Sequence, residues 1–478
     1  EAADAEQSLS YAGLVAMVDK LAGKLRQADA RVAAILADNT PDWCVADLAL
    51  IAAAIPSVPV PHFFSPEQIS HLFRSAGVNL LITDRPEQAL QLLRATGIEA
   101  GAAQSFDCGS LYGITLPALA AVDLPAGCAK ITFTSGSTGD PKGVCLTQAT
   151  METVATSLAG ATAAAATDRH LSAMPYATLL ENIGGLYAPL LAGATVCAHG
   201  LAAVGLSGAS GLDVRAFVTR LAVSGATTTI MIPQMLHALV TALEMGMPKP
   251  AALRFIAVGG APVSLHLLER AERLGLPVFE GYGLSEAGSV VAVNRPGAVK
   301  PGSVGKPLPH VRLSFAGDGE ILVEGNLFSG YLGEAPRGDA AWPTGDLGYL
   351  DDEGFLHLSG RKKHIFITAF GRNVSPEWVE RELAIEPAIA QACVFGEAKS
   401  YNVAVIQPRQ GADAQAVMAA VAAANDRLPD YARVSRWVTA REPFSVGNGQ
   451  WTGTGRPRRG EIERSYAAEL TSLYEEQA

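Results

Sequence analysis

The sequence has little of what binds nucleic acids, crosses membranes or enters a secretory pathway. Its 36 Lys and Arg are outnumbered by 47 Asp and Glu, and the net charge of -11 argues against a dedicated nucleic-acid or anionic-membrane binder. The longest apolar run, near Leu48 to Val60, contains two prolines and is too short to span a bilayer. The first residues lack the basic and apolar regions of a signal peptide. We therefore expect no nucleic-acid partner, no transmembrane segment and a cytoplasmic protein.

Cysteine is also scarce. The six cysteines are scattered without a CxxC pair, which argues against a zinc site or a disulfide framework and favours buried thiols in a reducing compartment. The chain is globular in composition, with 49% hydrophobic and 17% charged residues, and its 478 residues are too many for one typical core. We therefore expect more than one domain.

Strand-like and helix-like stretches alternate along most of the chain. Arg31–Ala37 is typical of a buried strand, and Pro41–Ala54 is typical of a helix with proline in its first turn. The alternation restarts after residue 150, with helices expected over Leu179–Leu191 and Val214–Val223. This pattern predicts largely parallel sheets covered by helices.

The pattern changes twice toward the C-terminus. Between Val291 and Leu358 glycine and proline are frequent and the expected strands are short, which indicates a small antiparallel barrel or sheet. Beyond Gly360 a compact α+β module of about a hundred residues follows. The predicted fold is therefore α/β, with a large domain of two α/β subdomains plus a small β-barrel (residues 1–360) and a small, mobile α+β domain (residues 361–478).

The stretch ITFTSGSTGDPKGV, residues 131–144, has the clearest chemistry. A β-branched and aromatic strand leads into a loop of glycines and hydroxyls. Such a loop lets backbone amides surround an anion, and Lys142 adds a positive charge suited to phosphate. A flexible linker is the alternative, but a linker needs neither the strand before the loop nor the Pro-Lys-Gly after it. The predicted phosphate-binding residues are Thr134, Ser135, Gly136, Ser137, Thr138, Gly139 and Lys142.

This loop is not a Walker A motif, because Lys142 lies between Pro141 and Gly143, which counts against a nucleotide-hydrolysing switch or motor. It resembles the TSGSTGxPKG signature of the adenylate-forming superfamily, which comprises acyl- and aryl-CoA synthetases, peptide-synthetase adenylation domains and luciferases. Four further stretches resemble elements of that family in the same order: VGGAPVS (258–264), FEGYGLSEAG (279–288), TGDLGYLDDEGFLHLSGRKK (344–363) and FGRNVSPEWVERE (370–382).

Taken singly, these four stretches indicate only turns, a hairpin and a helix start. The resemblance implies more. Glu286 would bind Mg²⁺, for which a carboxylate beside substrate phosphates is suited, and Tyr282 would lie against the adenine. The other residues to which the resemblance gives a role in binding nucleotide, acyl group or pantetheine are Gly260, Ala261, Pro262, Gly281, Gly283, Ser285 (in place of Thr), Asp346 and Arg361 (both ribose) and Gly371 (pantetheine), with Lys363 as the hinge between domains.

Two departures from the family pattern affect the prediction. The family's C-terminal catalytic lysine has no counterpart, since no lysine follows Lys399, and the matching position is Arg456. Arginine keeps the charge with a different reach, so we expect Arg456 to substitute; the alternative is a basic surface turn. A PLxH-like stretch of many relatives is replaced here by Pro175–Thr178. The acyl pocket is expected around Tyr176, Thr178, Glu181 and Pro233.

The resemblance implies an ATP- and Mg²⁺-dependent ligase that activates a carboxylic acid as acyl-AMP and then transfers the acyl group to a thiol. A fatty or aryl acid is expected, because the residues of the predicted acyl pocket are apolar and small to medium in size. The run LLENIGGLYAPLLAGA resembles long-chain fatty acyl-CoA synthetases more than amino-acid-activating domains, and coenzyme A is the expected acceptor. The expected catalytic residues are Thr134, Lys142, Glu286 and Arg456. Two alternatives stay open: transfer to the phosphopantetheine of an acyl or peptidyl carrier protein or to an amine, and a nucleotide-binding pseudoenzyme that lacks adenylation.

Overall fold

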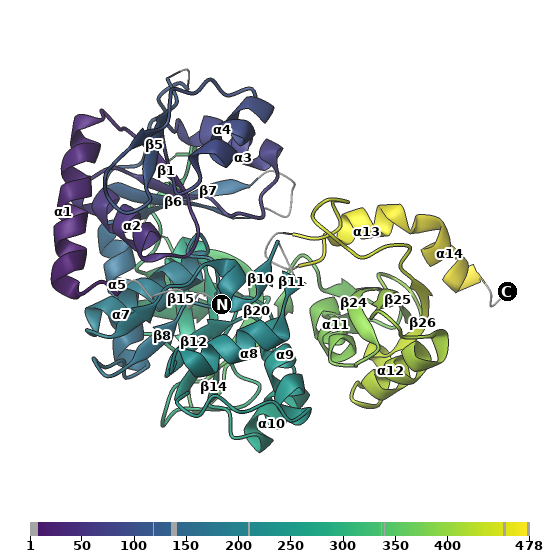
Figure 1. Cartoon of the computed structure of the whole chain (residues 1–478). Coiled ribbons are helices and arrows are strands. Elements are labelled where there is room, and N and C mark those ends of the chain that lie inside the picture. Colours follow the sequence, from purple (N-terminus) through teal and green to yellow (C-terminus); the bar gives the residue numbers. More distant parts are fainter. Residues whose placement is uncertain are drawn as a thin grey trace.

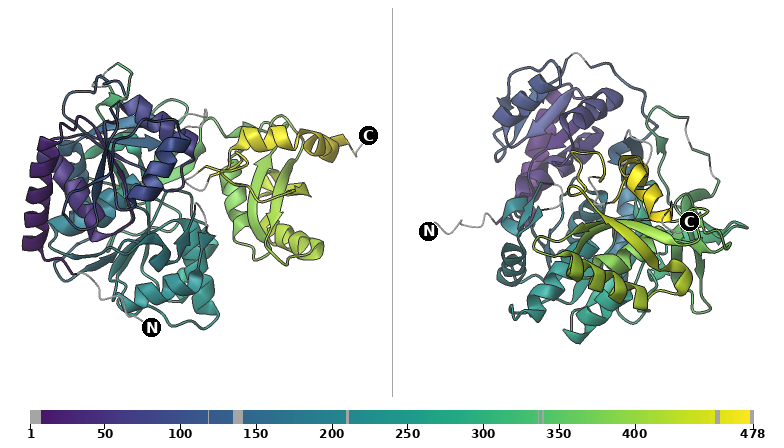
Figure 2. Two further views of the ribbon diagram at one scale, coloured as in Figure 1. Left: turned by 45° about the horizontal axis from the view of Figure 1, so that its top comes forward. Right: turned by 90° about the vertical axis from the view of Figure 1, so that its right-hand side faces the viewer.

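The computed structural model describes residues 8–117, 119–134, 141–208, 211–335, 337–338, 340–452 and 456–475. The chain forms a large part, up to about residue 360, and a smaller C-terminal part that lies to one side of it (Figure 1). The left view of Figure 2 shows the two parts joined only by a narrow region. The arrangement agrees with the predicted order of a large α/β region followed by a small α+β region.

An eight-stranded sheet carries the hairpin that flanks the phosphate loop. Strands β2, β1 and β3 are parallel, β6 lies parallel to β2, and β7 pairs antiparallel with β6. Neighbouring residues of β1 face different cores, because Ile35 packs with Trp43 whereas Ala34 packs with Phe73. Helices thus cover both faces, as the alternation predicted. The bounds are α1 (Tyr11–Gln27), β1 (Ala33–Leu36), α2 (Pro41–Ala53), β2 (Ser57–Pro59), α3 (Pro66–Ala76), β3 (Leu80–Thr83), α4 (Pro86–Ala95), β4 (Gln104–Ser105), β5 (Tyr112–Thr115), β6 (Cys128–Thr134), β7 (Lys142–Thr147) and β19 (Gly330–Tyr331).

A seven-stranded sheet forms the rest of the large α/β region. Strands β9, β8, β12, β13 and β14 are parallel, and β15 returns antiparallel to β14. Residues such as Met231 and Ile256 pack in one core on one face, whereas Phe255 joins the core shared with the first sheet. The bounds are α5 (Gln148–Ala161), β8 (Arg169–Leu171), β9 (Thr195–Cys197), η2 (Leu201–Val204), β10 (Leu206–Ser207), β11 (Gly211–Leu212), α8 (Val214–Val223), β12 (Thr228–Met231), α9 (Pro233–Glu244), β13 (Phe255–Val258), α10 (Leu265–Arg273), β14 (Val278–Leu284), η3 (Ser285–Ala287), β15 (Ser289–Val293) and β16 (Lys306–Pro307).

The segment predicted as one helix over Leu179–Leu191 is helical throughout but changes its hydrogen bonding in the middle. A short α6 (Leu179–Glu181) leads into a π-helical stretch, η1 (Asn182–Tyr187), and then into α7 (Ala188–Leu191). Hydrophobic periodicity does not separate π from α turns, so the sequence could not predict this change. Such π-helical turns are frequent at functional sites.

The remaining elements are an open antiparallel sheet and the C-terminal part. In the described residues the sheet has four strands in the order β17-β18-β20-β21, a half-barrel where a small barrel or sheet was predicted. The C-terminal part packs helices on a sheet of β24, β25 and β26. The bounds are β17 (Val311–Phe315), β18 (Glu320–Gly325), β20 (Trp342–Leu350), β21 (Leu356–Arg361), β22 (Phe366–Ile367), β23 (Asn373–Val374), α11 (Pro376–Ala384), β24 (Ile389–Phe395), β25 (Asn402–Pro408), α12 (Ala414–Asp426), η4 (Asp430–Ala432), β26 (Val434–Thr439), α13 (Arg459–Ser465) and α14 (Ala467–Glu475).

The cysteines and the longest helices bear on two expectations drawn from the composition. The six cysteines are free thiols, and all but the half-buried Cys128 are buried. Among the described helices, none combines the length and the apolar character that a membrane crossing needs.

Candidate active site

A continuous pocket lies where the carboxyl ends of β12, β13 and β14 meet the β6–β7 hairpin and the C-terminal part. The carboxyl edge of a parallel sheet is where ligands of α/β proteins bind. Residues from all five motifs line this pocket, among them Lys142, Gly260, Tyr282, Asp346 and Ser375. Residues more than two hundred positions apart in the sequence, such as Lys142 and Asp346, therefore line one pocket.

The phosphate-loop hairpin places Thr134 at the end of β6 opposite Lys142 at the start of β7. The Lys142 ammonium lies 2.9 Å from Oε1 of Glu334 and 4.8 Å from the centre of the Tyr331 ring. The Lys142 side chain is half-exposed and lines the pocket, so its ammonium can also face an anion there. The predicted loop residues Ser135, Gly136, Ser137, Thr138 and Gly139 lie outside the described residues.

Glu286 lies on the short turn η3, next to Ser285, and its surroundings orient the carboxylate. The Tyr331 hydroxyl donates to Oε1 of Glu286 at 2.7 Å, and the Phe328 amide donates to the Glu286 carbonyl at 2.8 Å. Burial, followed by the Glu286 carboxylate, raises the pKa of Tyr331, so its hydroxyl stays a donor. One carboxylate with open space beside it fits Mg²⁺, which takes few protein oxygens and completes its shell with phosphates and water.

A second group of side chains meets where β14 approaches the half-barrel. The Tyr282 hydroxyl donates to Oδ2 of Asp346 at 2.7 Å, and Nε of Arg361 lies 2.9 Å from Oδ1 of the same carboxylate. Burial, followed by Asp346, raises the pKa of Tyr282 well above its usual value. A Cβ at Gly283 would lie 1.7 Å from the Ser289 carbonyl oxygen, so β15 can approach this strand only at a glycine. The register of β14 and β15 shifts between Tyr282 and Gly283, and a Cβ at Gly281, just before this shift, would lie 3.3 Å from the Ala292 carbonyl oxygen.

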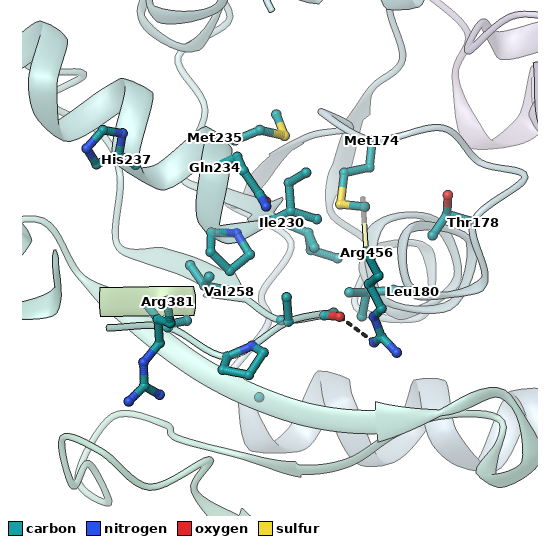
Figure 3. A pocket seen from close by; sticks show the side chains of 18 of the residues that line it. Met174, Thr178, Leu180, Ile230, Gln234, Met235, His237, Val258, Arg381 and Arg456 are labelled. Carbon is teal, nitrogen blue, oxygen red and sulfur yellow. Dashed lines mark hydrogen bonds between the residues drawn. The ribbon is translucent and has the colours of Figure 1, made fainter. Parts of the chain in front are cut away.

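The turn Gly260–Ala261–Pro262 receives an arginine from the C-terminal part. Gly260 has a φ of +83°, and its carbonyl accepts a hydrogen bond from the Arg456 guanidinium (Figure 3). Desolvation and then the nearby charge of Arg361 lower the pKa of Arg456, and the carboxylate of Asp346 partly offsets this shift. Arg456 therefore lines the pocket while it stays exposed to solvent.

Lys363, the predicted hinge, lies at the pocket, whereas Gly371, predicted to contact pantetheine, lies in an exposed turn. Lys363 lines the pocket, and burial lowers the pKa of its ammonium group, with a further contribution from Arg361. Gly371 lies in an exposed turn with a φ of +72°, beside Phe370, whose side chain is 75% exposed. The structure does not bring Gly371 to the other predicted site residues.

Only part of the predicted acyl pocket lines the cavity. Thr178 and Pro233 do so, and Figure 3 shows Thr178 near Met174, Leu180 and the Arg456 side chain. Tyr176 and Glu181 are instead fully buried behind the wall, which corrects their prediction as pocket residues.

The partners that hold these two residues come from other elements. Tyr176 stacks on Trp43 with ring centres 5.0 Å apart and shares a hydrogen bond of 2.7 Å with Ser172. Glu181 lies 3.2 Å from Nε2 of His170.

Sequence reasoning missed Tyr331 and Glu334, which contact Glu286 and Lys142. Tyr331 reaches the site because β19 pairs with β7, with Tyr331 opposite Val144. It lies 45 residues from Glu286, so no local spacing connects the two. The dipeptide Gly330-Tyr331 follows Leu327, Phe328 and Ser329, a pattern typical of many strand ends.

Comparison with known proteins agrees with this geometry. The AMP-binding enzyme family matches residues 1–332, and the AMP-binding enzyme C-terminal domain matches residues 363–478. The chain is similar to a long-chain-fatty-acid–CoA ligase of Mycobacterium bovis, with 26% identity over 91% of this chain and 86% of the relative. It is also similar to a 2-succinylbenzoate–CoA ligase of Bacillus subtilis, with 29% identity over 82% of this chain and 80% of the relative.

Two solved structures have a similar fold. An anthranilate CoA ligase in complex with anthranoyl-AMP aligns with a TM-score of 0.80 at 18% identity, over 98% of this chain and 95% of the other. O-succinylbenzoate coenzyme A synthetase from Bacillus subtilis in complex with AMP aligns with a TM-score of 0.74 at 25% identity, over 96% and 94%. With the ordered motifs and the two family matches, these similarities lead to one conclusion: the chain belongs to the AMP-binding enzyme family, that is, to the adenylate-forming superfamily.

Proposed function

We propose that this protein activates a carboxylic acid with ATP and transfers the acyl group to coenzyme A. The observation that carries the proposal is the contact between Arg456 of the C-terminal part and the Gly260 carbonyl of the large part. It places a permanent positive charge in the pocket that Lys142, Glu286 and Asp346 share. The CoA ligases among the similar proteins support the same reaction class.

In the first half-reaction, a carboxylate oxygen of the acid attacks the α-phosphorus of ATP. The bond from this phosphorus to the bridging oxygen breaks, so acyl-AMP forms and pyrophosphate leaves. Protein groups contribute mainly position and charge to such a step. Lys142 and Thr134 would hold the phosphates, Tyr282 would lie against the adenine, and Arg456 would stabilise the negative charge that develops.

The other nucleotide contacts follow from the same placement. Asp346 and Arg361 would receive the ribose hydroxyls, since both lie beside Tyr282 at the pocket wall. Glu286, oriented by Tyr331, would hold Mg²⁺. The ion would supply charge neutralisation to the phosphates of ATP.

In the second half-reaction, the thiol of coenzyme A attacks the acyl carbonyl, a thioester forms and AMP leaves. We propose that residues 361–478 first rotate about Lys363, which would withdraw Arg456 and bring Gly371 to the pantetheine arm. The positions in the structure support this order, because Arg456 faces the pocket whereas the Gly371 turn is exposed to solvent. A few residues at the end of β21 are enough to re-aim the whole C-terminal part.

The test is carboxylate-dependent ATP–pyrophosphate exchange with a panel of aliphatic and aryl acids. We expect Arg456→Ala to lower this exchange about 100-fold, because the positive charge near Gly260 is lost. Arg456→Lys should largely retain the exchange, because lysine keeps that charge. Arg312→Ala is the matched control, since Arg312 lies on the half-barrel with its side chain 81% exposed.

The pseudoenzyme alternative makes the opposite prediction. Calorimetry would then detect ATP binding, and no acid of the panel would support exchange. Formation of an amide or of a carrier-protein thioester, with no reaction of coenzyme A, would instead change the acceptor and leave the adenylation step in place.

A further inference from the structure

The pocket does not end at the nucleotide site but continues into the large part, between one face of the seven-stranded sheet and the helices opposite. Leu158 of α5 and Gly184 of the π-helical stretch line it on the helix side. The sheet contributes Thr228, Ile230 and Ala257 from β12 and β13. We call this extension the slot. Its walls are mostly apolar.

Gly184 packs closely on the sheet where the π-helical stretch passes it. A Cβ at Gly184 would lie 3.0 Å from Cδ1 of Ile230 and 3.8 Å from Cδ1 of Leu158. Ile230 is paired in register with Ala257, so both strands meet the slot at the same level. Any side chain at residue 184 would therefore obstruct the slot at this level. At that separation no atom fits between Gly184 and Ile230, so the two residues together form one wall of the slot.

The polar groups along the slot have partners within the protein. Nδ1 of His170 lies 3.0 Å from Oγ1 of Thr228, and Nε2 of His170 lies 3.2 Å from Glu181. At the far end, Arg254 pairs with Asp168 and donates to the Thr162 carbonyl at 3.0 Å. Groups satisfied in this way favour an apolar ligand over one with polar substituents.

The strand register sets the length of the slot. His170, Thr228 and Phe255 lie at one level, and Gly259 follows Phe255 by four residues. At ~3.3 Å per residue this is about 13 Å. An extended chain of C–C bonds of ~1.5 Å advances about 1.3 Å per carbon. About ten carbons therefore fit between the turn at Gly259 and the level of Phe255, and the far end at Arg254 adds one residue step.

We propose that the acid is a linear, unbranched aliphatic carboxylate of about ten to fourteen carbons, with its chain in the slot and its carboxylate at the Gly260 turn. This inference rests on the proposed adenylation. Because each buried methylene contributes about fourfold to binding, acids that fill the slot gain most.

The experiment measures kcat/KM for acyl-AMP formation with linear saturated acids of about four to eighteen carbons, and with benzoate and phenylacetate. For the native protein we expect a rise of up to about fourfold per added carbon, an optimum near twelve carbons and a fall beyond about sixteen. In Gly184→Leu the slot is blocked at Ile230, two residues or about 7 Å from the Gly259 level. The optimum should then move to about six carbons, with butanoate unaffected.

Two further variants keep the test decisive. Ala257→Val narrows the slot at the same level from the sheet side, and serves if Gly184→Leu lowers the unfolding temperature. Gly160→Leu is the matched control, because a Cβ at Gly160 has no atom within 4 Å. We expect the control to keep the native chain-length profile.

The outcomes separate the slot from the reaction. An unchanged optimum in both Gly184→Leu and Ala257→Val, or a preference for benzoate over dodecanoate in the native protein, overturns the slot and leaves adenylation intact. If no acid supports adenylation, calorimetry with dodecanoate decides: binding that Gly184→Leu abolishes supports the slot without the reaction, and no binding overturns both.

Discussion

Two lysines of one β-hairpin each contact a carboxylate, but in opposite surroundings. On β6, Lys130 donates to Asp47 at 2.6 Å, to Asn182 at 2.7 Å and to Tyr187 at 3.1 Å, and the side chains of this ion pair are 1% and 0% exposed. On β7, Lys142 pairs with Glu334 at 2.9 Å, and each of these two side chains is 52% exposed.

The difference distinguishes a structural lysine from a ligand-binding one. The cost of burying the Lys130 charge is offset because the ammonium has fixed partners in Asp47, Asn182 and Tyr187. Burial lowers the pKa of Lys130, and the Asp47 carboxylate raises it. The exposed pair of Lys142 contributes little to stability, so a phosphate can take the place of Glu334. A replaceable partner, more than charge itself, identifies the lysine that acts on a ligand.

The largest expected effect comes from breaking the buried network. Lys130→Met leaves the Asp47 carboxylate buried without its cation and should lower the free energy of unfolding by about 3–5 kcal/mol in urea titrations. Lys142→Met is the control and should change it by less than about 1 kcal/mol. Equal losses in the two variants would contradict the distinction.

A buried carboxylate at the pocket wall gives the next effect. Glu280 is 8% exposed, and burial raises its pKa to about 7 against a usual 4.5, with Arg381 acting in the opposite direction. The pKa of Glu280 is higher in the folded than in the unfolded protein. The stability that the protonated Glu280 contributes is therefore present below about pH 4.5 and is lost as the pH rises through 7. Relative to Glu280→Gln, the native protein should lose about 3 kcal/mol between pH 5 and 8. Parallel stability profiles for the two proteins would rule this out.

Removal of the Tyr331 hydroxyl, which donates to the predicted Mg²⁺ ligand Glu286, should weaken Mg²⁺ binding more than it lowers the stability of the fold. Tyr331→Phe keeps the ring beside Lys142 but leaves Glu286 without its donor, so the Mg²⁺ concentration for half-maximal ATP binding in calorimetry should rise about tenfold. Tyr349→Phe is the control, since that side chain is 53% exposed and stacks on His357. An unshifted Mg²⁺ dependence would remove Tyr331 from the site.

The smallest effect concerns the replaceable partner itself. Glu334→Gln removes the charge that competes with phosphate for Lys142, so ATP should bind more tightly, by at most about fivefold. Titration at two salt concentrations provides the check, because an exposed pair is screened by salt. Weaker ATP binding in this variant would mean that Glu334 assists the ligand.

Local patterns predicted the elements well where one segment carried the whole signal. The helix expected over Val214–Val223 has these bounds, because Asp213 accepts the Ala216 amide at its start. The phosphate-loop lysine and the glycines of β14 also came from local spacing. Gly283 has to be a glycine because a side chain at this position would clash with the backbone of the adjacent strand β15.

Other features depended on partners that no local pattern contains. Tyr176 and Glu181 lie in a stretch predicted to line the acyl pocket, yet Trp43 and His170 hold them in the core. Gly184 matters only because Ile230 lies opposite it. The direction of a side chain from a helical segment follows from the packing of elements distant in sequence, and this packing is what a single sequence does not reveal.

Carboxylate-dependent ATP–pyrophosphate exchange of Lys142→Ala, measured beside its thermal unfolding, shows whether the half-exposed lysine acts on the ligand. We expect exchange to fall about 100-fold or more, because the positive charge beside the phosphates of ATP is lost, while the unfolding temperature stays nearly unchanged. Exchange within about threefold of the native rate would contradict it, and would show that the half-exposed lysine is no more a ligand-binding group than the buried one.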